Sequence, residues 1–377
     1  MPRPADTAPA ADRVLTANLN VFTAPELDPR VHAVRSWAWA DGRPADAVRA
    51  ALERDARGML RGVEGGAEIA ARYAGGKHVL QGGGRVGTLR ALRWLAREVR
   101  AAERVLVGAV PPGGRDRPLW LALVAMALLA RRPLVVYSET WLHPAGPRNA
   151  PRRLLDRGLA AVATTILVPG RVHVAHYERS GYAGKVRQVP APYPAAAVPE
   201  HAIGGDGDGG GRPSGEPELL PELLFVGRVM PLKGLDRLLD LVDELDASGV
   251  RVRLVALLGD PGTQFRGGDD AYATRCLARL RARDRGRTEV HTAPVDVDPF
   301  YRRATLLVVP NRVQPRDRVP AESWGRVVPE ALAAGLPVVS TDAVPSAVEH
   351  VVDGRSGTVV PWADDAALNA AVRRWLP

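Results

Sequence analysis

The fold of this 377-residue chain is indicated by the segment Leu223–Leu245, which reads LLFVGRVMPLKGLDRLLDLVDEL. Its opening apolar run predicts a buried strand that ends at Gly227. Apolar residues at helical spacing after Gly234 predict a helix. Strand–loop–helix units of this kind build parallel α/β sheets, in which ligands bind beyond the carboxyl ends of the strands. The loop between Gly227 and Gly234 is therefore the first place to look for a site.

Two cations stand five residues apart in this loop, Arg228 and Lys233. Arginine grips two oxygens with a planar fork, and lysine adds a compact mobile charge. The helix that follows would contribute its N-terminal amides. This arrangement suits a diphosphate, and an exposed basic turn is the competing interpretation.

A second signal is the segment Glu322–Gly335, ESWGRVVPEALAAG. Pro329 fits only the first turn of a helix, which predicts a helix start near Gly325 or Arg326. Backbone amides at such a start attract an anion. They would belong to Trp324, Gly325 and Arg326.

Glu322 then lies in the loop before this helix, and Glu330 lies about one turn into it. Carboxylates accept hydrogen bonds from hydroxyl groups, so each of the two suits a sugar ring. The competing interpretation is a pair of surface glutamates near a helix start, where negative charge is favourable in any case.

Short apolar runs alternate with helical patterns along the rest of the chain, which predicts two Rossmann-like, doubly wound parallel-sheet domains facing across a cleft. The sequence favours a domain over 1–195, a flexible Pro/Gly-rich linker or insert over 196–217, and a second domain over 218–377. Strands are expected at 14–22, 104–110, 134–137, 165–168, 223–226, 252–257, 305–309, 338–341 and 358–360. Helices are expected at 119–130, 151–163, 235–247, 270–285, 326–334 and 364–375.

Composition excludes several classes of protein. A single cysteine, Cys276, makes no internal disulfide and no cysteine-based metal site. The most apolar run, Leu119–Ala130, has 12 residues, whereas a spanning helix needs about 20. It is therefore interpreted as a buried helix. The N-terminus resembles no secretory signal, so a cytoplasmic protein is expected.

Charge is divided unevenly along the chain. Residues 1–200 hold 29 basic and 17 acidic residues, a net charge of +12, and residues 201–377 hold 22 and 25, a net charge of −3. A preference for arginine at the coding level is one explanation. The other is an anionic acceptor or peripheral contact of the first domain with the inner face of a membrane. No nucleic-acid recognition motif is found.

Taken together, the two segments resemble the retaining GT-B glycosyltransferases of family 4, the glycosyl transferases group 1. The shared pattern is G-R at Gly227–Arg228, K-G at Lys233–Gly234, two glutamates eight residues apart, and ALAAGLPVV at Ala331–Val339. The resemblance is strong over 218–363, looser over 134–193 and weak before residue 100.

The resemblance implies roles for the matching positions. Arg228 and Lys233 would stabilise the leaving nucleoside diphosphate, Glu322 would hold the donor sugar, and Glu330 would bind the ribose. Donor contacts would further include Gly227, Trp324, Gly325 and Arg326. The donor would be a UDP- or GDP-type nucleotide sugar used as co-substrate, with no metal and no other cofactor. The acceptor would be a sugar, a lipid-linked glycan or a small scaffold from polysaccharide or natural-product biosynthesis.

One departure concerns the first domain. Many relatives place a histidine after the strand that corresponds to Leu134–Tyr137, where this chain has Ser138 and Glu139, with His143 four residues further on. Glu139 is the candidate acid or base at that position. The departure keeps open a nucleotide-sugar-binding protein with altered chemistry, such as an epimerase or a pseudo-sugar coupling enzyme, or one without catalysis. A dinucleotide-dependent oxidoreductase is the remote alternative.

Overall fold

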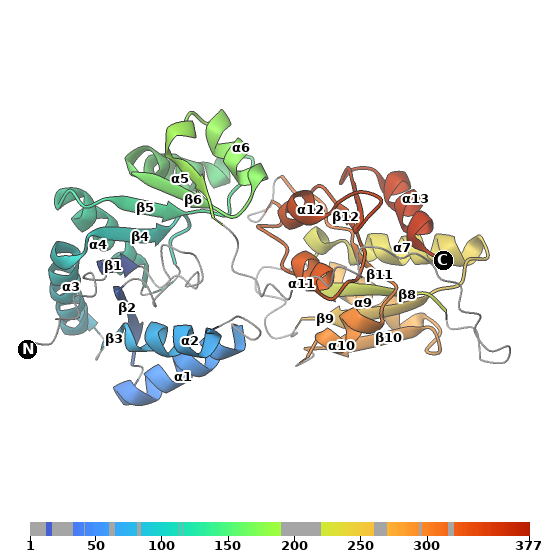
Figure 1. The fold of residues 1–377 in the computed structure, drawn as a ribbon, viewed down its shortest axis with the longest axis horizontal. Coiled ribbons are helices and arrows are strands. Elements are labelled where there is room, and N and C mark those ends of the chain that lie inside the picture. The colour runs from blue at the N-terminus through green and yellow to red at the C-terminus, as the bar shows by residue number, and fades with distance from the viewer. Residues whose placement is uncertain are drawn as a thin grey trace, which may run out of the picture. The chain divides into compact units, whose positions relative to one another are not determined.

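The computed structural model describes residues 13–16, 33–40, 42–59, 65–80, 84–112, 114, 116–189, 220–259, 270–293, 296–315 and 320–377. Internal contacts divide the chain into two compact units. The first unit comprises Met1–Trp141 and Pro147–Pro194, and the second comprises Leu142–Gly146 and Ala195–Pro377. Each unit is built around one parallel sheet (Figure 1).

The sheet of the first unit has seven strands in the order β3-β2-β1-β4-β5-β6-β7, all of them parallel. The chain starts in the middle at β1, fills one half of the sheet, and then crosses to fill the other. Such reversals of strand order are where doubly wound sheets bind ligands. The strands are β1 (Arg13–Thr16), β2 (Ala33–Trp39), β3 (Lys77–Leu80), β4 (Arg104–Gly108), β5 (Leu134–Tyr137), β6 (Thr165–Val168) and β7 (Val186–Gln188).

Helices cover both faces of this sheet. On one face, buried residues of the later helices share a hydrophobic core with Trp37 of β2. On the other, α1 packs against β2 and β3. The helices are α1 (Ala45–Met59), α2 (Gly66–Gly75), α3 (Gly84–Ala101), α4 (Asp116–Leu129), α5 (Ala150–Val162) and α6 (Arg171–Arg179).

The sheet of the second unit has six parallel strands in the order β10-β9-β8-β11-β12-β13. Its two faces carry separate cores, one with α7, α9 and α13 and one with α10, α11 and α12. The strands are β8 (Glu222–Gly227), β9 (Arg253–Leu258), β10 (Thr288–Thr292), β11 (Leu306–Val309), β12 (Val338–Thr341) and β13 (Gly357–Val360). The helices are α7 (Leu235–Ala247), α9 (Asp270–Ala282), α10 (Asp298–Arg303), α11 (Val327–Ala333), α12 (Pro345–His350) and α13 (Asp365–Trp375).

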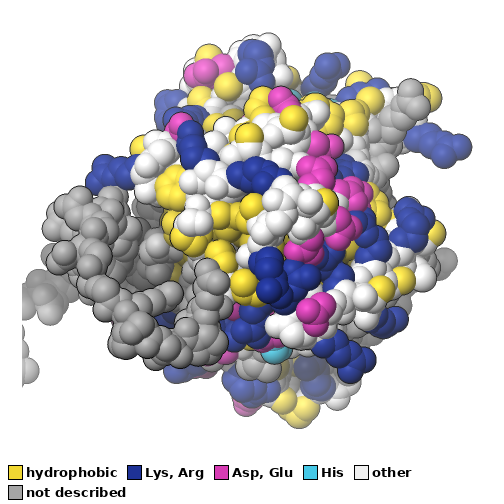
Figure 2. Space-filling model, turned by 90° about the vertical axis from the view of Figure 1, so that its right-hand side faces the viewer, with side chains coloured by type: hydrophobic (Ala, Val, Ile, Leu, Met, Phe, Trp, Pro, Cys, Tyr) yellow, Lys and Arg dark blue, Asp and Glu magenta, His cyan; other side chains and the backbone are white. Residues whose placement is uncertain are grey.

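Oppositely charged side chains pair on the surface of the second unit. Arg279 contacts Asp240 and Asp243 of α7, both at 2.7 Å, and Arg283 contacts Asp243 and Asp246. Figure 2 shows acidic and basic side chains lying next to one another on the face it presents. Networks of this kind offset local charge better than isolated surface pairs do.

The predicted fold class, two doubly wound parallel-sheet domains, is confirmed. The elements absent from the expected strands and helices are β2, β3, β7, β10, α1, α2, α3, α6, α10 and α12. The linker predicted over 196–217 lies outside the described residues.

The prediction of a buried helix over 119–130 is wrong on one side. In α4, Leu119 and Leu123 are buried, whereas Leu129 is 85% exposed. The helix covers only one face of the sheet and no other described element covers its outer side. None of the described helices is both long and apolar enough to span a bilayer.

Candidate active site

The loop after β8 is folded tightly against the end of β11. Pro231–Lys233 forms a single 3-10 turn, and Gly234 follows with φ 68°, in the left-handed region. A Cβ at Gly234 would lie 2.1 Å from the carbonyl oxygen of Pro310, so a larger residue would clash there. The close approach positions Lys233 beside the carboxyl end of β11.

Lys233 lies against Glu322 at this end of the sheet. The ammonium Nζ of Lys233 donates to Oε2 of Glu322, and the two side chains are only 13% and 14% exposed. Asn311, which is 1% exposed, donates its side-chain amide Nδ2 to the same oxygen at 3.1 Å. Two residues from different loops therefore fix one carboxylate, and charge-assisted hydrogen bonds of this kind are strong.

The backbone of Asn311 is itself anchored. Its carbonyl oxygen accepts hydrogen bonds from Oγ1 of Thr341 at 2.6 Å and from Nη1 of Arg237 at 3.3 Å. Arg237 also donates to the carbonyl of Pro310 at 3.1 Å and pairs with Asp365. Because these contacts use backbone oxygens, they hold the loop whatever side chain stands at position 311.

Burial would raise the pKa of Glu322, but neighbouring charge outweighs it. Lys233 is the main opposing influence, with smaller contributions from Arg228 and Asn311, and the net effect holds the pKa below its ordinary value. Arg228 itself is exposed at the start of the loop, directly after Gly227. Glu322 thus stays ionised and able to accept hydrogen bonds.

Glu330 lies on α11 and has two partners, one for each oxygen. Its Oε2 accepts from the hydroxyl of Tyr301 at 3.0 Å, and its Oε1 pairs with Arg326 at 3.2 Å. Tyr301 comes from α10 and is 1% exposed. Burial raises the pKa of Glu330 despite the opposing influence of Arg326 and Tyr301.

The helix start between the two glutamates has the predicted form. Arg326 caps α11, and Gly325 has φ 96°, a conformation that favours glycine. A Cβ at Gly325 would lie 2.4 Å from Cγ1 of Val344. Trp324 is 3% exposed and packs edge-on against His350, so its side chain is part of the core.

In the first unit, Glu139 and Ser138 follow β5. The hydroxyl of Tyr137 donates to Oε1 of Glu139 at 3.1 Å, and Glu139 is half-buried. Ser138 is buried, and its Oγ lies within hydrogen-bond distance, 2.7 Å, of the hydroxyl of Tyr177. The structure therefore leaves Glu139, and not Ser138, as the more accessible group after this strand.

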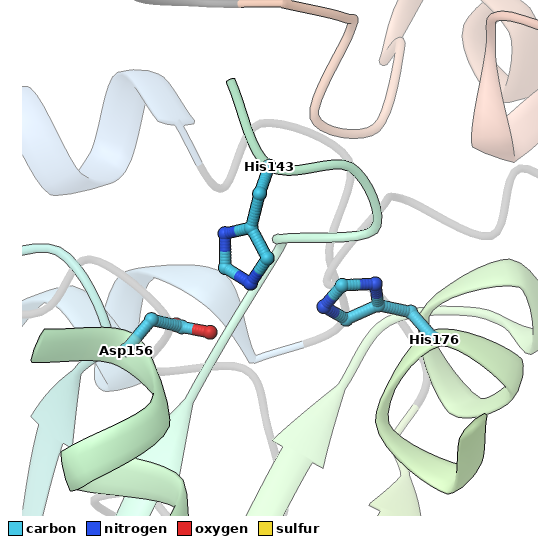
Figure 3. Close-up of side chains that lie close together, drawn as sticks. All are labelled: His143, Asp156 and His176. Atoms are coloured by element: carbon cyan, nitrogen blue, oxygen red, sulfur yellow. The ribbon is translucent and has the colours of Figure 1, made fainter. Parts of the chain in front are cut away.

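Near these residues, Figure 3 shows His143, Asp156 and His176 close together. Their potential ligand atoms lie within 4.8 Å of one another, and Asp156 accepts a further hydrogen bond from Tyr177 at 3.2 Å. Imidazole and carboxylate are ligands for divalent cations, but they also pair with one another without a metal. The expectation of a metal-independent site stays a prediction.

Two residues of the second unit, Asn311 and Tyr301, were not expected from the sequence. Asn311 carried a usable signal, since it is a polar residue directly beyond the carboxyl end of an expected strand. Tyr301 carried none, because it lies 29 residues before Glu330 in an element that was not foreseen.

A family model confirms the resemblance on which these roles depend. The model described as "Glycosyl transferases group 1" matches residues 212–377, which include Arg228, Lys233, Glu322 and Glu330. By this match, residues 212–377 are similar to the glycosyl transferases group 1 family.

Curated relatives match less than half of the chain. Two D-inositol 3-phosphate glycosyltransferases of Catenulispora acidiphila are 34% and 38% identical over 154 and 156 residues, 40% of this chain in each case. The matched segment spans 34% of the length of each relative.

Solved structures show the same fold over nearly the whole chain. Anabaena HepE in complex with UDP has a TM-score of 0.62 at 15% identity, covering 96% of this chain and 89% of that one. A glycosyltransferase from Rickettsia africae has a TM-score of 0.61 at 10% identity, covering 97% and 88%. Together with the two parallel sheets, these matches identify a GT-B fold.

Proposed function

We propose that this chain is a glycosyltransferase that moves a sugar from a nucleoside-diphosphate sugar to an acceptor, with retention of the anomeric configuration and without a metal ion. The observation that carries the proposal is the contact of Lys233 with Glu322 at the carboxyl ends of β8 and β11. It supports the proposal because a cation of the kind that binds phosphate lies next to a carboxylate of the kind that binds hydroxyl groups.

Lys233 and Arg228 would act on the leaving group. When the bond between the anomeric carbon and the diphosphate breaks, negative charge builds up on the phosphate oxygens. Cations placed in advance beside those oxygens stabilise the transition state, and such stabilisation is often the largest single contribution to catalysis. Lys233 would turn from Glu322 towards the diphosphate when the donor binds.

The same movement frees Glu322 for the sugar. Its carboxylate would accept a hydrogen bond from a sugar hydroxyl while Asn311 keeps it oriented. Glu330 would bind the ribose hydroxyls, with Tyr301 holding its other oxygen. Amides around Gly325 and Arg326 would meet the phosphates. In this scheme the acceptor attacks the anomeric carbon from the face that the leaving nucleoside diphosphate departs from, so the configuration is retained.

Relatives and neighbours support the donor half of the proposal. HepE has been solved with UDP-glucose, which favours a UDP-sugar as the first donor to try. The curated relatives are named for an inositol phosphate acceptor, but they match only 40% of this chain. For the first unit we infer an acceptor site at the carboxyl edge of its sheet, with Glu139 as candidate acid or base, and a cytoplasmic location.

A thermal-shift series tests the donor site. UDP, GDP and ADP, and separately UDP-glucose, GDP-glucose and ADP-glucose, would be added to the 377-residue chain. Ligands that bind only the folded state raise the Tm by mass action, about 2.7 kcal/mol of stabilisation at 100 times Kd. The best donor would then be incubated with polyol phosphates and glycans, and the anomeric configuration of the product read by NMR. A chain that no nucleotide stabilises would contradict the proposal, and binding without turnover would favour a binding protein.

A further inference from the structure

The outer surface of α3 and α4 in the first unit does not resemble the outside of an ordinary surface helix pair. A helix of a soluble domain normally buries an apolar stripe and exposes polar residues. Here α4 is apolar on both sides. We define the arginine–leucine face by the exposed side chains Arg90, Arg93, Arg97, Leu121, Leu128 and Leu129.

The two helices lie side by side with their outer faces continuous. Buried residues of both, including Trp94 and Trp120, belong to one hydrophobic core beneath them. At their C-terminal ends, Arg132 after α4 donates to the backbone carbonyl of Arg100 on α3. The face opposite this core is therefore one surface.

On α3, spacings of three and four residues align Arg90, Arg93 and Arg97 along one stripe. On α4, a spacing of seven aligns Leu121 with Leu128, and Leu129 stands beside them. Their exposed fractions are 50%, 42% and 85%. Among the described residues, nine large hydrophobic side chains are exposed. Only two of them, Val290 and Val352, lie in the second unit.

The one carboxylate within each of α3 and α4 is turned away from this face, and the exposed Glu103 comes after the end of α3. Glu98 of α3 and Asp156 of α5 are 5% and 7% exposed, and Asp116 at the start of α4 accepts a hydrogen bond from the indole of Trp37 at 2.9 Å. Within the described residues, Arg97 contacts one carboxylate oxygen, Oε1 of Glu98, at 3.5 Å from its Nη2. The face thus presents net positive charge around exposed leucines.

We propose that the arginine–leucine face docks on an anionic lipid bilayer. Interfacial helices insert apolar residues at the boundary of headgroups and acyl chains while basic residues contact anionic headgroups. With 14 residues, α4 is about 21 Å long and lies on a bilayer without crossing it. A second copy of the chain fits less well, because it would bring like charges together.

The direction of the helices gives this docking a consequence. Both α3 and α4 start where a strand, β3 or β4, has just ended, so their N-termini lie at the carboxyl edge of the sheet. If the proposed function holds, a membrane-bound acceptor would reach that edge without leaving the surface. The docking itself does not depend on sugar transfer.

Sedimentation with vesicles tests the proposal on the 377-residue chain. We expect binding to phosphatidylcholine vesicles that contain phosphatidylglycerol, weakening as salt rises, and no binding to phosphatidylcholine alone. The triple variant Arg90→Gln, Arg93→Gln, Arg97→Gln should lose roughly 100-fold in affinity. The double variant Leu128→Gln, Leu129→Gln should lose about 10-fold at every salt concentration.

Val352→Gln is the matched control, since Val352 is 54% exposed on the second unit and should leave binding unchanged. An unaltered Tm and unaltered nucleotide binding would show that each variant is folded. Equal binding to both kinds of vesicle, or binding that neither multiple variant weakens, would overturn the proposal. So would a dimer in solution that the leucine variant dissociates, because it would assign the face to a second copy.

Discussion

In the second unit the cation Lys233 lies against a carboxylate, whereas on the first unit the arginines of α3 point to solvent beside the leucines of α4. The two regions are both doubly wound sheets, so the difference does not come from topology. It comes from whether the cations have a carboxylate partner within the fold. Lys233 and Glu322 pair with one another, whereas among the described residues the arginines of the arginine–leucine face have only the contact of Arg97 with Glu98 at 3.5 Å.

The largest expected effect is that of Lys233→Ala. Without the ammonium, Arg228 is left as the cation for the diphosphate, and turnover should fall about 10²–10³-fold. The fold should persist, since Asn311 still donates to Glu322. Steady-state kinetics and a thermal melt measure the two effects. Lys233→Arg is the control that keeps the charge and alters its reach. If Lys233→Ala turned over within a factor of two of the native chain, Lys233 would have no role in stabilising the leaving group.

A smaller effect is expected for Asn311, which acts through Glu322. Asn311→Ala should lower turnover about 10-fold, the scale seen when a supporting hydrogen bond to a functional group is removed. Binding of the nucleoside diphosphate alone should not change, because the sugar and not the phosphate depends on Glu322.

Asn311→Asp separates positioning from general damage. At neutral pH a second carboxylate beside Glu322 repels it, so this variant should be slower than Asn311→Ala. As the pH falls, the new carboxyl takes up a proton and can donate again, and activity should partly return. A flat pH profile, or equal loss of nucleotide and nucleotide-sugar binding, would make Asn311 structural only.

The smallest effects concern stability and differ in sign between the two glutamates. The pKa of Glu322 is lowered in the folded chain, so its ionised form stabilises the fold above the ordinary value of 4.5, and that contribution is lost as the pH falls through the lowered pKa. Glu322→Gln should therefore cost about 1–2 kcal/mol at pH 7, and the difference should shrink in acid.

The pKa of Glu330 is raised, so its ionised form opposes folding once the pH exceeds the raised value. Glu330→Gln should stabilise the free chain at pH 7 by about 0.5–1 kcal/mol while weakening nucleotide binding, a trade-off common at functional sites. The gain should vanish as the pH falls towards 4.5. Urea unfolding at several pH values measures the free energy of unfolding of both variants. Changes of the same sign at pH 7 would refute the opposite effects assigned to the two glutamates.

The sequence by itself determined the parallel α/β class and most elements of the second unit, including the bounds of α7 and β12, because buried strands and amphipathic helices leave periodic patterns. It also predicted Arg228, Lys233, Glu322 and Glu330 as donor-site residues, since each stands in a loop or first helical turn that a neighbouring glycine or proline marks in the sequence.

Only the tertiary structure decided which of these groups touch. Asn311 reaches Glu322 and Tyr301 reaches Glu330 because strand order in the sheet brings distant loops together, and no local pattern encodes that order. The exposure of Leu129 was decided in the same way. An apolar helix has the same sequence whether both of its sides are covered or one, and here the sheet covers one side of α4 alone.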